Sequence, residues 1–175
     1  MTTRKLTITA LMAALVTIVT MTISIPIGMQ GYLNFGDILI FASALLFGPQ
    51  VALIAGGLGS ALADLLSGYA VWIPITLLAK GLEGYIAGKI CFNSKSKKRC
   101  LLGISLAGFV MVLVYYLGGV ILVYSTEGFK AALFSALSAV PFNILQVISG
   151  AIGGSMISYL LKDRIEKILN SYKKI

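Results

Sequence analysis

The chain has 175 residues, of which 58% are hydrophobic and 11% are charged, and its mean hydropathy is +0.97. Because soluble domains are about 25% charged, this composition excludes a soluble protein and predicts a single integral membrane domain over 1–175. The net charge of +8 does not indicate nucleic-acid binding, since twelve of the fourteen basic residues lie in three short segments beside apolar runs (4–5, 89–99 and 162–174), where anionic lipid headgroups of the bilayer are sufficient partners.

Six apolar runs are candidates for membrane-spanning helices, which need about 20 residues to cross ~30 Å of hydrocarbon. In chain order they are 6–24, 37–47, 50–67, 74–90, 101–124 and 141–161. The second run is short, so it either begins before Asp37 or has its ends covered by neighbouring helices. Gly48 and Pro49 separate it from the third run. The sequence therefore predicts an all-α bundle of six transmembrane helices.

The orientation follows from the basic segments. An even number of crossings puts both termini on one side, and the basic loop 91–100 lies on that same side because it follows the fourth helix. The positive-inside tendency makes this side cytoplasmic. The external loops are then 25–36, 68–73 and 125–140, and we expect the last to form a short helix lying on or dipping into the outer face.

The first helix has two distinct surfaces. Ala10 and Ala14 lie one turn apart on one face, where a neighbouring helix could approach closely. Such small-xxx-small patterns also occur where a helix packs only within its own bundle, and both uses stay open on this pattern alone. A second stripe, suited to burial with its hydroxyls bonded to backbone carbonyls, comprises Thr9, Ala13, Thr17, Thr20 and Ser24. In the third helix, Gly56, Gly57 and Gly59 predict close internal packing.

Four ionisable residues lie outside the basic segments and the external loop 125–140: Asp37, Asp64, Lys80 and Glu83. Each Asp or Lys costs roughly 2.5–3.5 kcal/mol at the centre of a membrane helix, so each should face a partner or a wet cavity. Lys80 and Glu83, three residues apart, can pair. One interpretation is a structural ion pair, such as Asp64 with Lys80. The other is a ligand site in which three carboxylates and one lysine leave acceptors unsatisfied, with Glu83 as the favoured ligand contact.

Amides and aromatic residues add to this candidate site. Asn143 and Gln146 share a face near the outer end of the sixth helix, and amides can read the edge of a heterocycle because they both donate and accept. Trp72 is either a pocket wall or part of an interfacial belt. Asn34 and Tyr116 complete the candidate set, although interfacial anchoring is the commoner use of a membrane tyrosine.

The residues of common catalytic sites are missing from the sequence. It contains no histidine, no Walker phosphate loop, no G-x-S-x-G and no H-E-x-x-H, and the spacing of Cys91 and Cys100 matches no metal motif. We therefore predict no catalytic residue, no cofactor and no metal. A small membrane enzyme would place carboxylates in a motif such as D-x-x-D, and an autonomous secondary transporter would show repeated halves; the sequence has neither.

The ordered motifs resemble a known family. They are Ala10-x-x-x-Ala14, "YLNFGD" before the second helix, "GSALADLLSG" in the third, "AKGLEGYIAGK" in the fourth and "VPFNILQ" in the sixth. Together they resemble the substrate-binding S components of energy-coupling factor (ECF) vitamin transporters, over nearly the whole chain.

This resemblance implies a plasma-membrane protein that captures a vitamin or its precursor from outside and docks on a transmembrane T subunit driven by two cytoplasmic ATPases, as part of an ABC-type importer. It assigns docking to Ala10 and Ala14, with Ile18 a departure at the third position of the longer alanine pattern. It also makes the segment 24–36 a lid over the pocket, and implies that the subunit topples in the membrane to release its cargo.

The substrate is less closely defined by the resemblance. "PFN" followed by a polar residue resembles the riboflavin-type S components, but these usually carry lysine where this chain has Gln146. A pocket of Glu83, Asn143 and Gln146 instead favours a small nitrogen heterocycle, such as hydroxymethylpyrimidine, a pyridoxine-like compound or thiamin.

Overall fold

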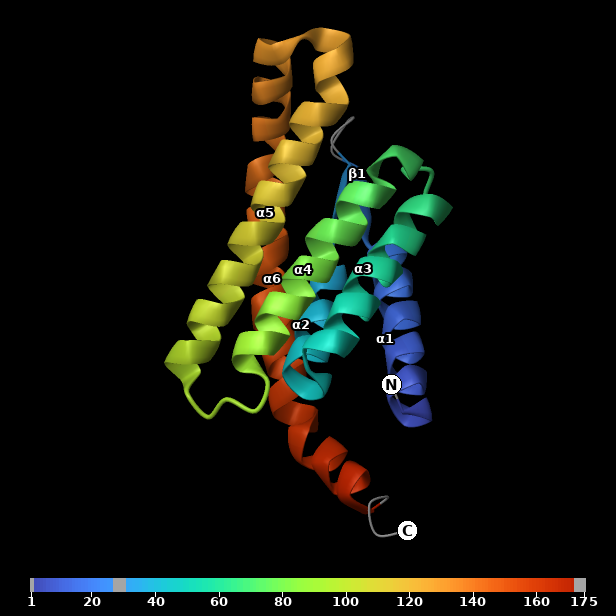
Figure 1. Ribbon diagram of the computed structural model, residues 1–175, viewed down its shortest axis with the longest axis vertical. Helices are drawn as coiled ribbons and strands as arrows, with labels where there is room; N and C mark the ends of the chain where they lie inside the picture. Colours follow the sequence, from blue (N-terminus) through green and yellow to red (C-terminus); the bar gives the residue numbers. More distant parts are fainter. Residues whose placement is uncertain (1, 27–30, 172–175) are drawn as a thin grey trace.

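The computed structural model describes residues 2–26 and 31–171, which form six α-helices, a short hairpin and one 3-10 turn (Figure 1). In chain order the elements are α1 (Thr3–Thr22), β1 (Ser24–Pro26), β2 (Tyr32–Asn34), α2 (Gly36–Phe47), α3 (Pro49–Leu66), η2 (Ala70–Trp72), α4 (Ile73–Cys91), α5 (Lys97–Glu127) and α6 (Phe129–Ser171). The predicted all-α bundle of six helices is confirmed for these residues.

Five of these helices are long and apolar enough to cross a membrane, and α2, with 12 residues, is not. The short second helix is enclosed by its neighbours, because α2 packs against α3, α4 and α6. Its residues Ile40 and Phe41 are fully buried. Neighbouring helices therefore cover α2, which was one of the two solutions that the sequence allowed for so short a run.

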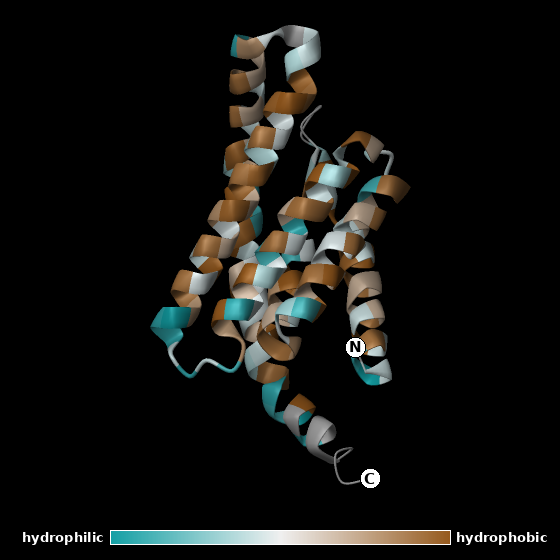
Figure 2. Cartoon of the chain, viewed as in Figure 1, coloured by the Kyte–Doolittle hydropathy of each residue, from teal (hydrophilic) through white to brown (hydrophobic). Residues whose placement is uncertain are grey.

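The basic segments lie at one end of the bundle. Figure 1 shows the start of α1, the end of α6 and the turn between α4 and α5 at this same end, and Figure 2 shows hydrophilic residues gathered there. We call it the basic end and infer from the positive-inside tendency that it faces the cytoplasm. The basic residues Lys173 and Lys174 lie outside the described residues.

The prediction of a separate short helix in an external loop over 125–140 is wrong. Gly128, with a φ of 77°, turns the chain directly from α5 into α6, so the two helices form a tall hairpin that projects beyond the other helices (Figure 1). The residues after this turn are rich in alanine and leucine, which favour helix. Pro141 therefore lies inside the 43-residue helix α6 instead of starting it.

The expected lid segment 24–36 contains an antiparallel hairpin. Helix α1 ends at Thr22. Beyond it, Ser24 of β1 pairs with Asn34 of β2, and Ile25 pairs with Leu33. Residues 27–30 of this segment lie outside the described residues. The hairpin leads straight into α2, which begins at Gly36.

Glycines let helices α3 and α4 approach very closely. A Cβ on Gly56 would lie 2.7 Å from the Lys80 carbonyl oxygen, and one on Gly84 would lie 2.5 Å from that of Ala52. Real Cβ atoms essentially never come so close to backbone, so larger residues would force the helices apart. The close packing predicted from the glycines of the third helix is confirmed.

Threonine hydroxyls of α1 bond to carbonyls of the same helix, and one of them joins α1 to α3. Thr9 Oγ1 donates to the Lys5 carbonyl at 2.7 Å, and Thr17 Oγ1 donates to the Gly59 carbonyl of α3 at 2.8 Å. Thr9, Thr17 and Thr20 are buried, as the sequence predicted for this stripe, but Ser24 is exposed. The Thr20 hydroxyl also lacks the predicted bond to a backbone carbonyl among the described residues. Ala10 and Ala14 are exposed on a different face of α1, next to this stripe.

Candidate functional site

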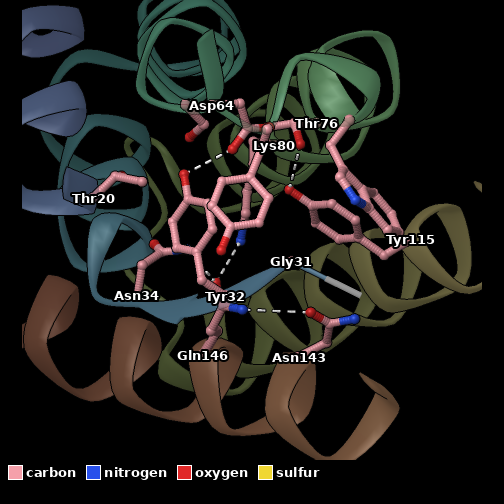
Figure 3. A pocket seen from close by; sticks show the side chains of 13 residues that line it. Thr20, Gly31, Tyr32, Asn34, Asp64, Thr76, Lys80, Tyr115, Asn143 and Gln146 are labelled. Atoms are coloured by element: carbon pink, nitrogen blue, oxygen red, sulfur yellow. Dashed lines mark hydrogen bonds between the residues drawn. The ribbon is translucent and has the colours of Figure 1, made fainter. Parts of the chain in front are cut away.

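A polar cavity lies at the end of the bundle opposite the basic end, between the hairpin and the helices (Figure 3). Its volume is about 30 Å³, which holds about two water molecules. The lining residues are Thr20, Gly31, Tyr32, Asn34, Ser60, Asp64, Tyr69, Trp72, Thr76, Lys80, Tyr115, Asn143 and Gln146. They come from α1, α3, α4, α5, α6, η2 and the hairpin, so the cavity depends on the whole fold.

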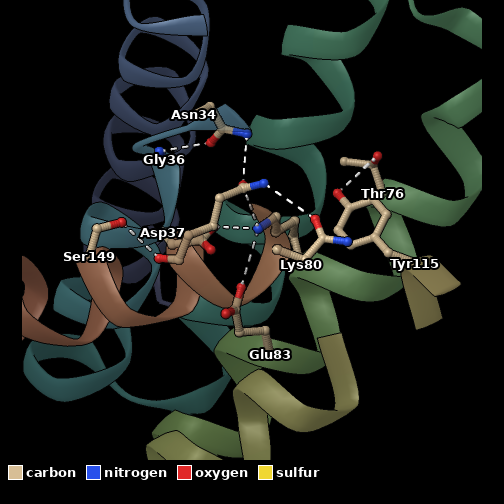
Figure 4. A network of polar contacts seen from close by, with 10 residues as sticks. Asn34, Gly36, Asp37, Thr76, Lys80, Glu83, Tyr115 and Ser149 are labelled. Carbon is tan, nitrogen blue, oxygen red and sulfur yellow. Dashed lines mark hydrogen bonds and ion pairs between the residues drawn. The ribbon is translucent and has the colours of Figure 1, made fainter. Parts of the chain in front are cut away.

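A buried ion network forms the floor of the cavity (Figure 4). Lys80 Nζ lies 2.5 Å from Asp37 Oδ1 and 3.8 Å from Glu83 Oε2. All three side chains are at most 2% exposed. The predicted pairing of Lys80 with Glu83 is confirmed. The carboxylate closest to Lys80 is that of Asp37, at the start of α2. Asp64 forms no ion pair with Lys80 in the described part of the chain, so the alternative pair of Asp64 with Lys80 is wrong. Sequence spacing could not find this contact, because its partners lie 43 residues apart.

Amide side chains connect this network to the hairpin. Asn34 Nδ2 donates to Gln146 Oε1 at 2.9 Å, and Lys80 Nζ donates to the same oxygen at 3.3 Å. Gln146 in turn donates to Asn143 Oδ1 at 3.4 Å. Asn34 is itself held by the Gly36 backbone N–H, which donates to its Oδ1 at 2.9 Å. A substitution of Gln146 therefore removes hydrogen bonds to both Asn34 of the hairpin and Lys80.

Tyr32 links the hairpin to α3. Its hydroxyl donates to Asp64 Oδ1 at 2.7 Å. Burial, and then the nearby Asp64 carboxylate, raise the pKa of Tyr32 above its ordinary value, so the phenol stays a donor. This bond closes the hairpin over the cavity.

Aromatic rings form the side walls. The Tyr32 and Tyr69 rings have centroids 4.9 Å apart, and those of Trp72 and Tyr115 are 6.2 Å apart. Tyr115 also donates from its hydroxyl to Thr76 Oγ1 at 3.1 Å, which fixes its ring. A flat ring system could stack against such walls.

Two acceptors in the cavity wall are left unsatisfied. Thr20 Oγ1 is buried and has no hydrogen-bond partner among the described residues. Asp64 Oδ2 also has no hydrogen-bond partner among the described residues, although the Thr76 hydroxyl lies close to the Asp64 carboxylate. Buried polar atoms usually have partners, so these atoms indicate a place for ligand donors.

The structure brings most of the predicted site residues together. Asn34, Asp64, Trp72, Lys80, Asn143 and Gln146 line the cavity. Glu83 and Tyr116 are absent from the lining: Glu83 lies below Lys80, fully buried, and the neighbouring Tyr115 supplies the aromatic wall.

The predicted site did not include seven of the lining residues, which are Thr20, Gly31, Tyr32, Ser60, Tyr69, Thr76 and Tyr115. Ser60 precedes Asp64 by four residues and Thr76 precedes Lys80 by four, so each shares a helix face with a charged residue. That spacing could have identified both. Tyr69 lies in a connection, where no periodicity exists to place it.

Residues 1–163 match the protein family described as "ECF-type riboflavin transporter, S component". The chain belongs to this family. Its members are components of transporters, and the chain is accordingly a multi-pass membrane protein of that class. The resemblance recognised from the ordered motifs is confirmed.

Individual relatives agree with this assignment. The chain is 46% identical over 155 residues to an uncharacterised protein of Pyrococcus woesei, a match that covers 88% of this chain and 99% of that protein. It is 30% identical over 173 residues to the thiamine precursor transporter HmpT of Lactococcus lactis subsp. cremoris (strain MG1363), covering 98% and 94% of the two chains. A solved S component of a bacterial ECF transporter has the same fold, with a TM-score of 0.69 at 24% identity over 97% of this chain and 99% of that chain.

Proposed function

We propose that this S component binds a small nitrogen heterocycle with hydrogen-bond donors in the cavity beneath the hairpin. The observation that carries the proposal is the pair of unsatisfied acceptors, Thr20 Oγ1 and Asp64 Oδ2, beside the amide of Gln146. A ligand with amino and hydroxyl groups could supply the missing donors. The favoured candidates are hydroxymethylpyrimidine, a pyridoxine-like compound and thiamin, and the similarity to a thiamine precursor transporter supports the first.

Riboflavin is the second candidate, since the family description names it. The size of the cavity argues against it. A space of about 30 Å³ must expand for any ligand. Less expansion is needed for the one or two rings of the favoured candidates than for a tricyclic flavin with its ribityl chain. The aromatic pairs beside the cavity suit either ring system.

The assembly that goes with this function is an ECF-type importer in the plasma membrane. We propose that Ala10 and Ala14, exposed on α1, contact a transmembrane T subunit, which two cytoplasmic ATPases drive. Their small side chains would allow close helix approach. The apolar residues Leu11, Leu15 and Ile18 are exposed on the same helix, which supports an interface there.

Isothermal titration of the purified protein tests the substrate. We expect heat from one of the three small heterocycles and weaker or no binding of riboflavin. Gln146→Leu should weaken binding about tenfold or more, because it leaves Asn34 and Lys80 without their shared acceptor. Gln50→Leu makes the same change on the exposed start of α3 and should leave affinity unchanged. Tighter binding of riboflavin than of all three small compounds would overturn the proposal.

A further inference from the structure

A second and larger cavity lies at the basic end, far from the site beneath the hairpin. It is a groove of about 350 Å³ between the end of α2, the end of α4, the start of α5 and the later part of α6. Figure 1 shows α5 and α6 separating toward this end. The lining residues are Leu45, Leu46, Cys91, Asn93, Ser94, Lys97, Cys100, Leu101, Ile104, Ser155, Ser158, Tyr159 and Lys162. Substrate binding beneath the hairpin makes no use of this groove.

The walls of the groove are apolar and open to the membrane. Leu101 is 67% exposed and Tyr159 is 85% exposed, one on each of the two separating helices. Ile104 is buried at the inner side. A volume of about 350 Å³ falls in the range of sites that hold small molecules, about 300–1,000 Å³. In a bilayer, a groove with such exposed apolar walls can take an acyl chain.

The rim of the groove is positively charged. Lys97 from α5 and Lys162 from α6 line it from opposite sides, and among its described lining residues there is no carboxylate. Lys97 is also the first residue of α5, a 31-residue helix whose N-terminus carries a partial positive charge. Two lysines and a helix N-terminus at one opening attract a phosphate group.

A buried hydroxyl points independently to a polar ligand. Ser158 is 7% exposed and lines the groove, yet its Oγ has no hydrogen-bond partner among the described residues. Serines in helices commonly bond to a backbone carbonyl of the preceding turn, as Ser149 does to Gln146 at 3.0 Å. Ser158 can therefore donate to an oxygen of a molecule in the groove.

We propose that this groove binds one anionic phospholipid of the cytoplasmic leaflet. The phosphate lies between Lys97 and Lys162, one acyl chain lies along Leu101 and Tyr159, and the Ser158 hydroxyl donates to a lipid oxygen. The basic end faces the cytoplasm, where basic pockets between membrane helices bind anionic headgroups. The proposal does not rest on the identity of the transported substrate.

Native mass spectrometry of the full chain tests the proposal. Delipidated protein is incubated with phosphatidylglycerol or with phosphatidylcholine of the same acyl chains, and the retained lipid is counted. We expect one phosphatidylglycerol to be retained in preference to phosphatidylcholine. The double variant K97A/K162A should lower this retention about 25-fold, since each of the two lysines near an anionic headgroup contributes about fivefold.

The control K95A/K98A removes two charges from the same exposed segment, outside the groove lining. It should retain phosphatidylglycerol like the unaltered chain. Equal losses in the two double variants would show diffuse charge attraction and overturn the proposal. So would equal retention of both lipids by the unaltered chain, or no retention at all.

A second variant blocks the groove without changing its charge. Ser155→Trp places a large side chain on the exposed part of the lining and should abolish lipid retention, with circular dichroism and size-exclusion profiles unchanged. Retention of phosphatidylglycerol by this variant would show that the lipid lies elsewhere.

Discussion

Replacing Lys80 with methionine should destabilise the protein more than any exposed lysine change. The ammonium lies 2.5 Å from Asp37 and 3.8 Å from Glu83. At an effective dielectric constant of ~20, these distances correspond to direct attractions of roughly 7 and 4 kcal/mol, much of which offsets the desolvation of the three groups. Removing one partner of a buried pair costs about 3–5 kcal/mol, because the remaining charge stays buried without compensation. We expect a loss of this size.

The measurement is unfolding in mixed micelles, followed by the fluorescence of Trp72, the single tryptophan of the chain. Lys89→Met, on the exposed surface of the same helix, is the control and should cost less than about 1 kcal/mol. The double variant D37N/K80M should recover part of the loss, since it removes the uncompensated Asp37 charge. If Lys80→Met costs no more than Lys89→Met, the ion network does not hold the cavity floor.

Two further predictions test the proposed docking face of α1 and the proposed substrate cavity. Ala14→Trp should block co-purification with the T subunit and leave substrate affinity unchanged, because the exposed tryptophan side chain would hold a neighbouring helix away. Ala131→Trp on α6 is the matched control. Equal loss of assembly in both variants would refute an interface on α1. Asp64→Asn should weaken substrate binding in titrations more than Glu83→Gln, since Asp64 lines the cavity and Glu83 does not. A larger loss of affinity in Glu83→Gln than in Asp64→Asn would indicate that Glu83 contacts the ligand.

The helices could be predicted from the sequence because each depends on a property of one segment. An apolar run long enough to cross the bilayer becomes a helix wherever it packs, and Gly48 with Pro49 ends α2 whatever the neighbours do. The error at 125–140 arose from treating Pro141 as a helix start. The turn is made by Gly128, and membrane helices tolerate an internal proline where neighbouring groups satisfy the freed carbonyl.

The site was less predictable because it depends on which helices become neighbours. The carboxylates and amides could be recognised from the cost of burying them in an apolar run. Their partners could not, since Asp37 reaches Lys80 and Asn34 reaches Gln146 across 43 and 112 residues. The roles of Tyr32 and Tyr115 as cavity walls are equally hidden, because an interfacial tyrosine has the same sequence pattern.

The position of Glu83 shows how little separates a lining residue from a residue of the floor. Thr76, Lys80 and Glu83 share one face of α4, at intervals of about 6 and 4.5 Å along the helix axis. The first two line the cavity, and the third lies beneath it, in contact with Lys80. Sequence periodicity gives the shared face but not the depth at which the cavity ends. That depth is set by Asp37 and Gln146, which reach Lys80 from α2 and α6 and close the floor at its level.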